Sequence, residues 1–153
     1  MENSAKLLER LRDLCARSEQ CSADIYQKAM KALDWDSKAS QKIVDSLVED
    51  GYVDDSRYAC AFARDKAQLT GWGPVKISYA LRGKGIGKEA IASALAEIDE
   101  EKASAKLNSL LIAKFRTLQG ESDAKLRLLK YALTRGYEYS QIEDLVDDIV
   151  AGK

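Results

Sequence analysis

The 153-residue chain has the length of one ordinary domain, and 46% of its residues are hydrophobic, which is enough for a buried core. Because 24 lysines and arginines face 25 aspartates and glutamates, a general attraction of the whole protein to nucleic acid or to an anionic membrane is excluded, and such binding would need local patches. No apolar run approaches the roughly 20 residues of a membrane span, and Met1 to Ser4 lack the apolar segment of a secretory signal.

The first third of the chain predicts three helices, because apolar residues recur there at spacings of three and four. The first apolar segment runs from Ala5 to Cys15. The second opens at Ser22, a residue type that often caps helices. The third opens between residues 37 and 40 and ends at Gly51.

The middle of the chain predicts the same plan. Asp54–Asp55 precede a helical segment that extends to Leu69, and their carboxylates can cap free backbone N–H groups at its start. Pro74 follows a glycine-rich break and is expected to occupy the first position of a short helix that ends by Gly85. A third apolar face follows over residues 86–98.

The last third predicts a long helix over about 103–118 and a second helix that ends at Gly136. Residues 140–143 have the spacing of a capping box and are expected to open the final helix.

These segments can be superposed, which predicts a tandem array. A shift of 48 residues carries Leu33 onto Leu81, and a further shift of about 51 reaches Ala132. A repeat of this length is typical of arrays in which each unit covers the apolar face of its neighbour. We therefore expect an all-α protein of three three-helix repeats at 1–50, 51–100 and 101–153. Chance similarity between Leu- and Ala-rich helices is the alternative.

The residues needed for most catalytic chemistry are missing. The chain has no histidine, which removes the commonest general base and metal ligand, and it has no phosphate-binding loop of the Walker type. A Ser-Lys arrangement stays open, although nothing marks one serine out. Asp54 and Asp55 could be read as a metal or acid–base pair, but helix capping explains them. We expect no enzyme, no metal and no cofactor.

The three cysteines, Cys15, Cys21 and Cys60, have neither metal-binding nor redox spacing. We interpret them as small buried apolar residues. Reduced cysteines fit a cytoplasmic protein best.

Basic residues are unevenly distributed. Between residues 64 and 88, Asp65 is the only acid among six lysines and arginines, and the excess of basic residues continues over 102–135. Beyond 136 the chain is acidic. An ordinary solvated helix surface explains this pattern as well as a basic strip for phosphate or an acidic partner does.

The stretch Gly51–Ala59 combines a glycine, an aromatic, an aliphatic residue, two aspartates and an aromatic–alanine pair. Gly73–Pro74 and Lys84–Ile86 follow, and Arg135–Tyr137 forms a weaker motif. Over roughly residues 20–150 the chain resembles the RecX family, whose members modulate the RecA recombinase. The residues that carry the resemblance or support the fold are Gly51, Tyr52, Asp54, Asp55, Tyr58, Gly73, Pro74, Gly85 and Gly136.

The resemblance implies an elongated, modestly curved array without catalytic residues. It implies binding to the RecA–single-stranded DNA filament and inhibition of its strand exchange, ATP hydrolysis and coprotease activity, as part of recombination, DNA repair and the SOS response. Naked DNA should bind weakly, and we expect a monomer. The chain departs from the family at Asp34–Asp36, where a basic-glycine turn is typical. That departure puts in doubt whether the first repeat makes the same contact.

Turns of stacked repeats tend to emerge on one side, and two of these turns concentrate positive charge. The residues hypothesised to contact the filament are Lys76, Arg82, Lys84, Lys88, Lys130 and Arg135. As exposed residues, Lys84 and Arg135 are expected to matter little for stability. The alternative functions are a helix-turn-helix-like DNA-binding module and a helical scaffold for some other acidic partner.

Overall fold

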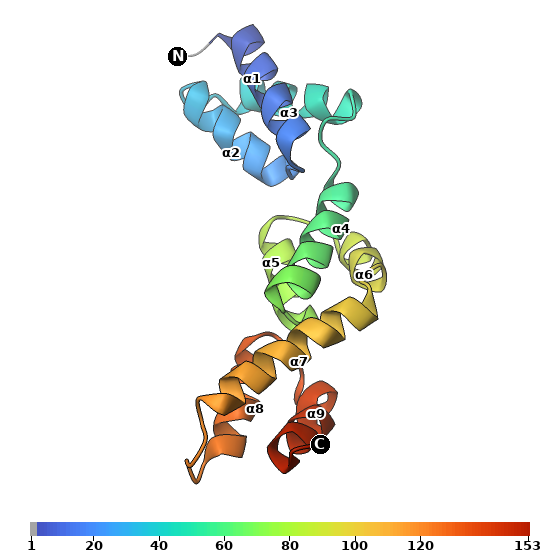
Figure 1. Cartoon of the computed structure of the whole chain (residues 1–153). Coiled ribbons are helices and arrows are strands. Elements are labelled where there is room, and N and C mark those ends of the chain that lie inside the picture. Colours follow the sequence, from blue (N-terminus) through green and yellow to red (C-terminus); the bar gives the residue numbers. More distant parts are fainter. Residues whose placement is uncertain (1–2) are drawn as a thin grey trace.

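The protein is described here by a computed structural model that covers residues 3–153. Residues 1 and 2, which belong to the predicted first repeat, lie outside the described residues. Residues 3–153 form α-helices and one π-helical turn, with no strand, as predicted. Figure 1 shows the helices stacked into an elongated, gently bent column with the two termini at opposite ends.

The first helical group comprises α1 (Ser4–Arg17), α2 (Ser22–Ala32) and α3 (Ser37–Glu49). Asn3 caps α1 by accepting a hydrogen bond from the N–H of Ala5, and Asp36 caps α3 by accepting one from the N–H of Ala39. The group ends in a left-handed turn at Gly51, where φ is +77°.

The second helical group comprises α4 (Asp55–Asp65), the π-helical turn η1 (Lys66–Thr70), α5 (Pro74–Gly83) and α6 (Lys88–Ala96). The predicted helix up to Leu69 is therefore continuous, but its hydrogen-bond register changes at Lys66. Gly71 closes this segment with φ +77°, and Pro74 is the first residue of α5, as predicted.

The third helical group comprises α7 (Glu100–Arg116), α8 (Ala124–Thr134) and α9 (Tyr139–Ala151). The prediction that Ser140 caps α9 is wrong by two residues. The cap is Glu138, whose backbone N–H donates to the side-chain oxygen of Gln141 at 2.9 Å. The capping box thus has the expected chemistry in a different register.

The spacing between the first two groups corrects the shift of 48 residues. Ser4 and Asp55, which begin α1 and α4, are 51 positions apart, and so are Ser37 and Lys88, which begin α3 and α6. The sequence alignment was therefore wrong by three residues. Amphipathic helices rich in Leu and Ala align almost as well when they are displaced by nearly one turn.

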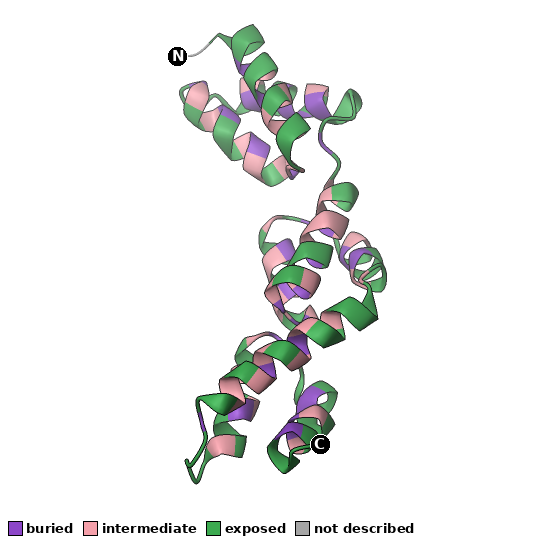
Figure 2. Ribbon diagram, in the orientation of Figure 1, coloured by how far each residue is buried: buried purple, intermediate pink, exposed green. Residues whose placement is uncertain are grey.

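Each helical group has its own core of buried residues (Figure 2). Val53 belongs to the core of the first group, whereas Cys21, from the loop between α1 and α2, belongs to the core of the second. We propose that the three groups are repeats of one unit, with boundaries near the sequence-based divisions. Because Cys21 packs in the second core and Val53 in the first, the first two groups are not separated at a single point in the sequence.

Candidate partner-binding surface

Asp54 and Asp55 have different functions in the structure. The Asp54 carboxylate caps α4 by accepting a hydrogen bond from the N–H of Arg57 at 3.0 Å, as predicted. The prediction for Asp55 is wrong. Its carboxylate accepts from the N–H of Ser22, the first residue of α2, at 2.8 Å. Asp55 thus caps a helix of the first group from the second group, and it joins the two.

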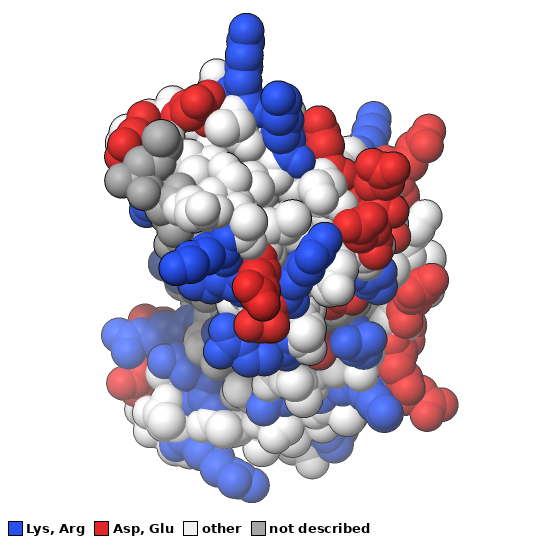
Figure 3. Space-filling view, turned by 90° about the horizontal axis from the view of Figure 1, so that it is seen from above, with Lys and Arg blue, Asp and Glu red and all other residues white. Residues whose placement is uncertain are grey.

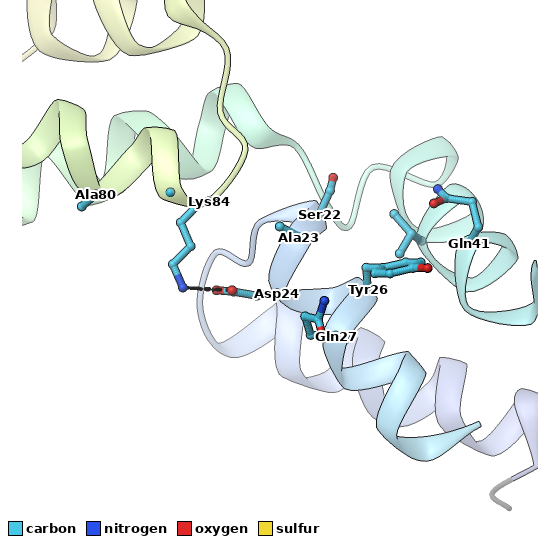
Figure 4. A pocket seen from close by; sticks show the side chains of 10 residues that line it. Ser22, Ala23, Asp24, Tyr26, Gln27, Gln41, Ala80 and Lys84 are labelled. Carbon is cyan, nitrogen blue, oxygen red and sulfur yellow. Dashed lines mark hydrogen bonds and ion pairs between the residues drawn. The ribbon is translucent and has the colours of Figure 1, made fainter. Parts of the chain in front are cut away.

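Lys84 also joins the first and second groups. Its Nζ lies 2.9 and 3.0 Å from the two carboxylate oxygens of Asp24, as Figure 4 shows. The hydrogen bond that the Lys84 ammonium group donates to Asp24 raises the pKa of Lys84 above its usual value. The pair borders a cleft of about 720 Å³ between the groups, lined by Tyr26 and Gln27 on one side and Ala80 on the other.

Backbone hydrogen bonds join the second group to the third. The N–H of Gly73 donates to the carbonyl of Arg135 at 2.7 Å, and the N–H of Val75 donates to the carbonyl of Gly136 at 3.0 Å. These donors are the otherwise unpaired N–H groups at the start of α5. The guanidinium of Arg135 donates in turn to the carbonyl of Thr70.

Two motif glycines allow this close approach. A β-carbon on Gly73 would lie 2.4 Å from the carbonyl oxygen of Gly136, and one on Gly136 would lie 2.3 Å from the β-carbon of Lys76. Gly136 also has φ +97°, a conformation that costs little only for glycine. Both positions therefore require glycine because two backbones touch there.

Trp72 completes the second junction, and sequence reasoning missed it. The ammonium groups of Lys66 and Lys76 lie 4.6 and 4.5 Å from the centroid of its ring. The hydroxyl of Tyr137, in the third group, donates to the Trp72 carbonyl at 3.4 Å. The Gly-Trp-Gly sequence around Trp72 was the available signal, but it was read only as a chain break.

The remaining motif residues support local structure. Gly85 has φ +77° with open space around it, so its glycine is needed for the turn alone. The ring of Tyr58 lies 5.8 Å from that of Phe62 and packs against the second core. Tyr52 is partly exposed, with the guanidinium of Arg12 over its ring at 5.4 Å.

The corresponding turn of the first group differs in the way the sequence suggested. Lys84 and Arg135 both follow the second helix of their group, and each bonds to the group before it. The same position in the first group is Leu33, which is buried in its own core. Asp34 and Trp35 then take left-handed conformations with φ +52° and +64°, and the Trp35 side chain is 61% exposed.

The six hypothesised partner contacts fall into two classes. The charged groups of Lys84 and Arg135 are bonded within the protein, and the ammonium group of Lys76 stacks on Trp72. The exposed side chains that remain are Arg82, Lys88 and Lys130. Arg82 and Lys130 lie on α5 and α8, the second helices of their groups, and neither helix contains an acidic residue.

At one end of the column both signs of charge occur. Viewed from above, blue and red side chains mix over the left and centre of the visible end, and red ones gather along its right edge (Figure 3). On α8 itself two cations are paired: Lys125 with Asp147 at 2.6 Å and Arg127 with Glu121 at 2.7 Å. Lys130 has no ion pair of this kind among the described residues.

The three cysteines are free thiols in the structure. Cys21 is buried as predicted, whereas Cys15 and Cys60 are only half-buried, and burial raises the pKa of all three thiols. Within residues 3–153 no cluster of Cys, Asp and Glu has the makings of a metal site. None of the helices over the same residues combines the length and apolarity that crossing a membrane requires.

Comparisons with known proteins identify the family. Residues 54–95 match the model of the RecX second three-helix domain. The regulatory protein RecX of Clostridium botulinum (strain Alaska E43 / Type E3) is 34% identical over 120 residues, which cover 74% of this chain and 55% of that protein. The chain thus spans little more than half the length of that relative.

The regulatory protein RecX of Escherichia coli (strain SE11) is 24% identical, over 92% of this chain and 90% of its own. A crystal structure of regulatory protein RecX superposes with a TM-score of 0.79 at 26% identity, covering 95% of this chain and 71% of the other. These relatives are named as regulatory proteins and not as enzymes. The chain belongs to the RecX family.

Proposed function

We propose that this protein binds the filament that a RecA-type recombinase forms on single-stranded DNA, and that it restrains strand exchange, ATP hydrolysis and coprotease activity. The family supports a regulatory function. The protein acts by covering an extended part of the filament surface, since its elongated column offers a long face (Figure 1). Such a protein works in the cytoplasm, as a monomer and without a cofactor.

One observation carries the proposal: α5 and α8 contain no acidic residue and present the exposed cations Arg82 and Lys130, in a chain whose net charge is −1. A local basic face in a neutral protein favours a partner with its own acidic surface over strong binding to naked DNA. Arg82, Lys88 and Lys130 are the exposed cations that we propose as contacts. Lys76 lies beside them, while Lys84 and Arg135 hold the column together.

Co-sedimentation tests this proposal. The full chain is mixed with recombinase filaments assembled on single-stranded DNA with a non-hydrolysable ATP analogue, and in parallel with the bare strand and with duplex DNA. We expect the chain to pellet with the filament and to bind the bare strand and the duplex much more weakly. Equal binding to DNA with and without recombinase would instead support the DNA-binding module.

A further inference from the structure

Large hydrophobic side chains are exposed on the same helices that carry the basic residues. Ten large hydrophobic side chains are prominently exposed among the described residues, and half of them lie on α5, on α8 or at the first residue of α9. These five are Val75 (47% exposed), Tyr79 (75%), Leu126 (53%), Leu133 (41%) and Tyr139 (50%). A single exposed leucine or tyrosine is ordinary, so their arrangement decides whether they form a surface.

The arrangement repeats. Val75, Tyr79 and Arg82 follow one another at i, i+4 and i+7 on α5, a spacing that places them on one helix face. On α8 the positions 51 residues later are Leu126, Lys130 and Leu133, with the same spacing. Both second helices therefore present an outward face that mixes apolar side chains with a cation.

The start of α5 adjoins the turn that follows α8 at the second junction. The N–H of Val75 donates to the carbonyl of Gly136, three residues after Leu133. A groove of about 380 Å³ lies there, lined by α5 residues that include Ser78 and Arg82 and by Glu138 and Gln141 at the start of α9. Backbone hydrogen bonds therefore keep the first turn of α5, which carries Val75, close to the last turn of α8, which carries Leu133.

The chemistry of this combined surface selects the class of partner. Phosphates of a nucleic acid would be held by the cations, but they would gain nothing from valine and leucine side chains. Apolar side chains contribute to binding when a partner removes them from water, and an apolar centre with a charged rim is typical of protein interfaces. The cations then select a partner with acidic residues around its own apolar patch.

We propose that the outer faces of α5 and α8 form one protein-docking surface, with Tyr79 and Leu133 as apolar anchors and Arg82 and Lys130 as its basic rim. This inference rests on the proposed function. It specifies that the surface binds the protein subunits of the recombinase filament and not the DNA strand. The matching site on those subunits would be an apolar patch bordered by acidic residues.

Two double variants test the docking surface, and both change exposed side chains. Tyr79→Ala with Leu133→Ala removes the anchors, and Arg82→Glu with Lys130→Glu reverses the rim. Trp35→Ala with Val48→Ala is the matched control, because those side chains are 61% and 48% exposed in the first group. Circular dichroism and the melting temperature establish that each variant is folded, and affinity is measured for filaments and for bare single-stranded DNA.

We expect the anchor variant to bind filaments at least tenfold more weakly while its weak binding to the bare strand is unchanged. The rim variant should also bind filaments more weakly, and its difference in affinity from the unaltered protein should shrink as the salt concentration rises. The control should stay within about twofold of the unaltered protein, the scatter typical of surface changes far from an interface. Such a pattern supports a surface that binds protein.

Three results would overturn the inference. If the anchor variant binds filaments normally, the apolar faces are not part of the interface, although the proposed function survives. If the rim variant loses filament and bare-strand binding equally while the anchor variant loses neither, the surface binds phosphate. If light scattering shows that the protein self-associates and the anchor variant does not, the surface joins copies of this chain. Failure of the unaltered protein to bind filaments would instead refute the proposed function itself.

Discussion

Replacing Gly136 with alanine perturbs the second junction at one atom. The new β-carbon would meet the Lys76 β-carbon at 2.3 Å and the Lys76 backbone nitrogen at 2.7 Å, so α5 and the α8–α9 turn must separate. The left-handed conformation of a non-glycine residue costs about 1–2 kcal/mol. Losing the two hydrogen bonds from Gly73 and Val75 adds roughly 1 kcal/mol each.

We therefore expect Gly136→Ala to lower the free energy of unfolding by about 3–4 kcal/mol, which is a large part of the roughly 5–15 kcal/mol of a typical domain. Urea denaturation followed by circular dichroism measures this change. Gly120→Ala is the matched control: Gly120 has φ +83° and nothing within 4 Å of a new β-carbon, so only the conformational cost of about 1–2 kcal/mol applies. Equal losses in the two variants would refute the claim that the glycine serves a backbone contact between groups.

The remaining predictions concern the first junction and the charges. Asp54→Ala should cost about 1 kcal/mol as a lost cap, and Asp55→Ala a similar amount, but only Asp55→Ala should increase the radius of gyration measured by X-ray scattering. Asp24→Lys and Lys84→Asp should each increase that radius, and the double swap should restore it; a swap that behaves like the single variants would contradict the ion pair. Reversing Lys84 and Arg135 together to Glu should lower the melting temperature, contrary to the sequence-based expectation, because both are bonded across junctions.

Local features of the fold could be predicted from the sequence. Helix periodicity, the cap at Asp54 and the first-turn proline of α5 all depend on residues close together in the chain. The relation between groups was harder, because one helical turn of displacement leaves the apolar pattern nearly unchanged. The correct spacing of 51 residues emerges only from where α1 and α4 begin.

The contacts of the candidate site were harder still to predict, because they join residues far apart in the chain. Lys84 and Arg135 looked like exposed turn cations, yet the partner of one is Asp24, 60 residues away, and that of the other is a backbone carbonyl. A carbonyl acceptor has no sequence signature. The prediction for Asp55 was wrong for a related reason. Two adjacent aspartates both look like caps of the helix that follows them, but Asp55 accepts its hydrogen bond from Ser22, in another group.

The rate of ATP hydrolysis by recombinase on single-stranded DNA, measured while the full chain is titrated in, tests the central claim most directly. We expect the rate to fall to a plateau, with at least tenfold more of the Arg82→Glu, Lys130→Glu variant needed for half the effect, a difference of about 1.4 kcal/mol. Reversing Asp144 and Asp148, which are exposed on the acidic α9, is the control and should shift the curve much less. An unchanged hydrolysis rate at saturating protein, or a curve shifted by the α9 reversal and not by the α5–α8 reversal, would contradict the account.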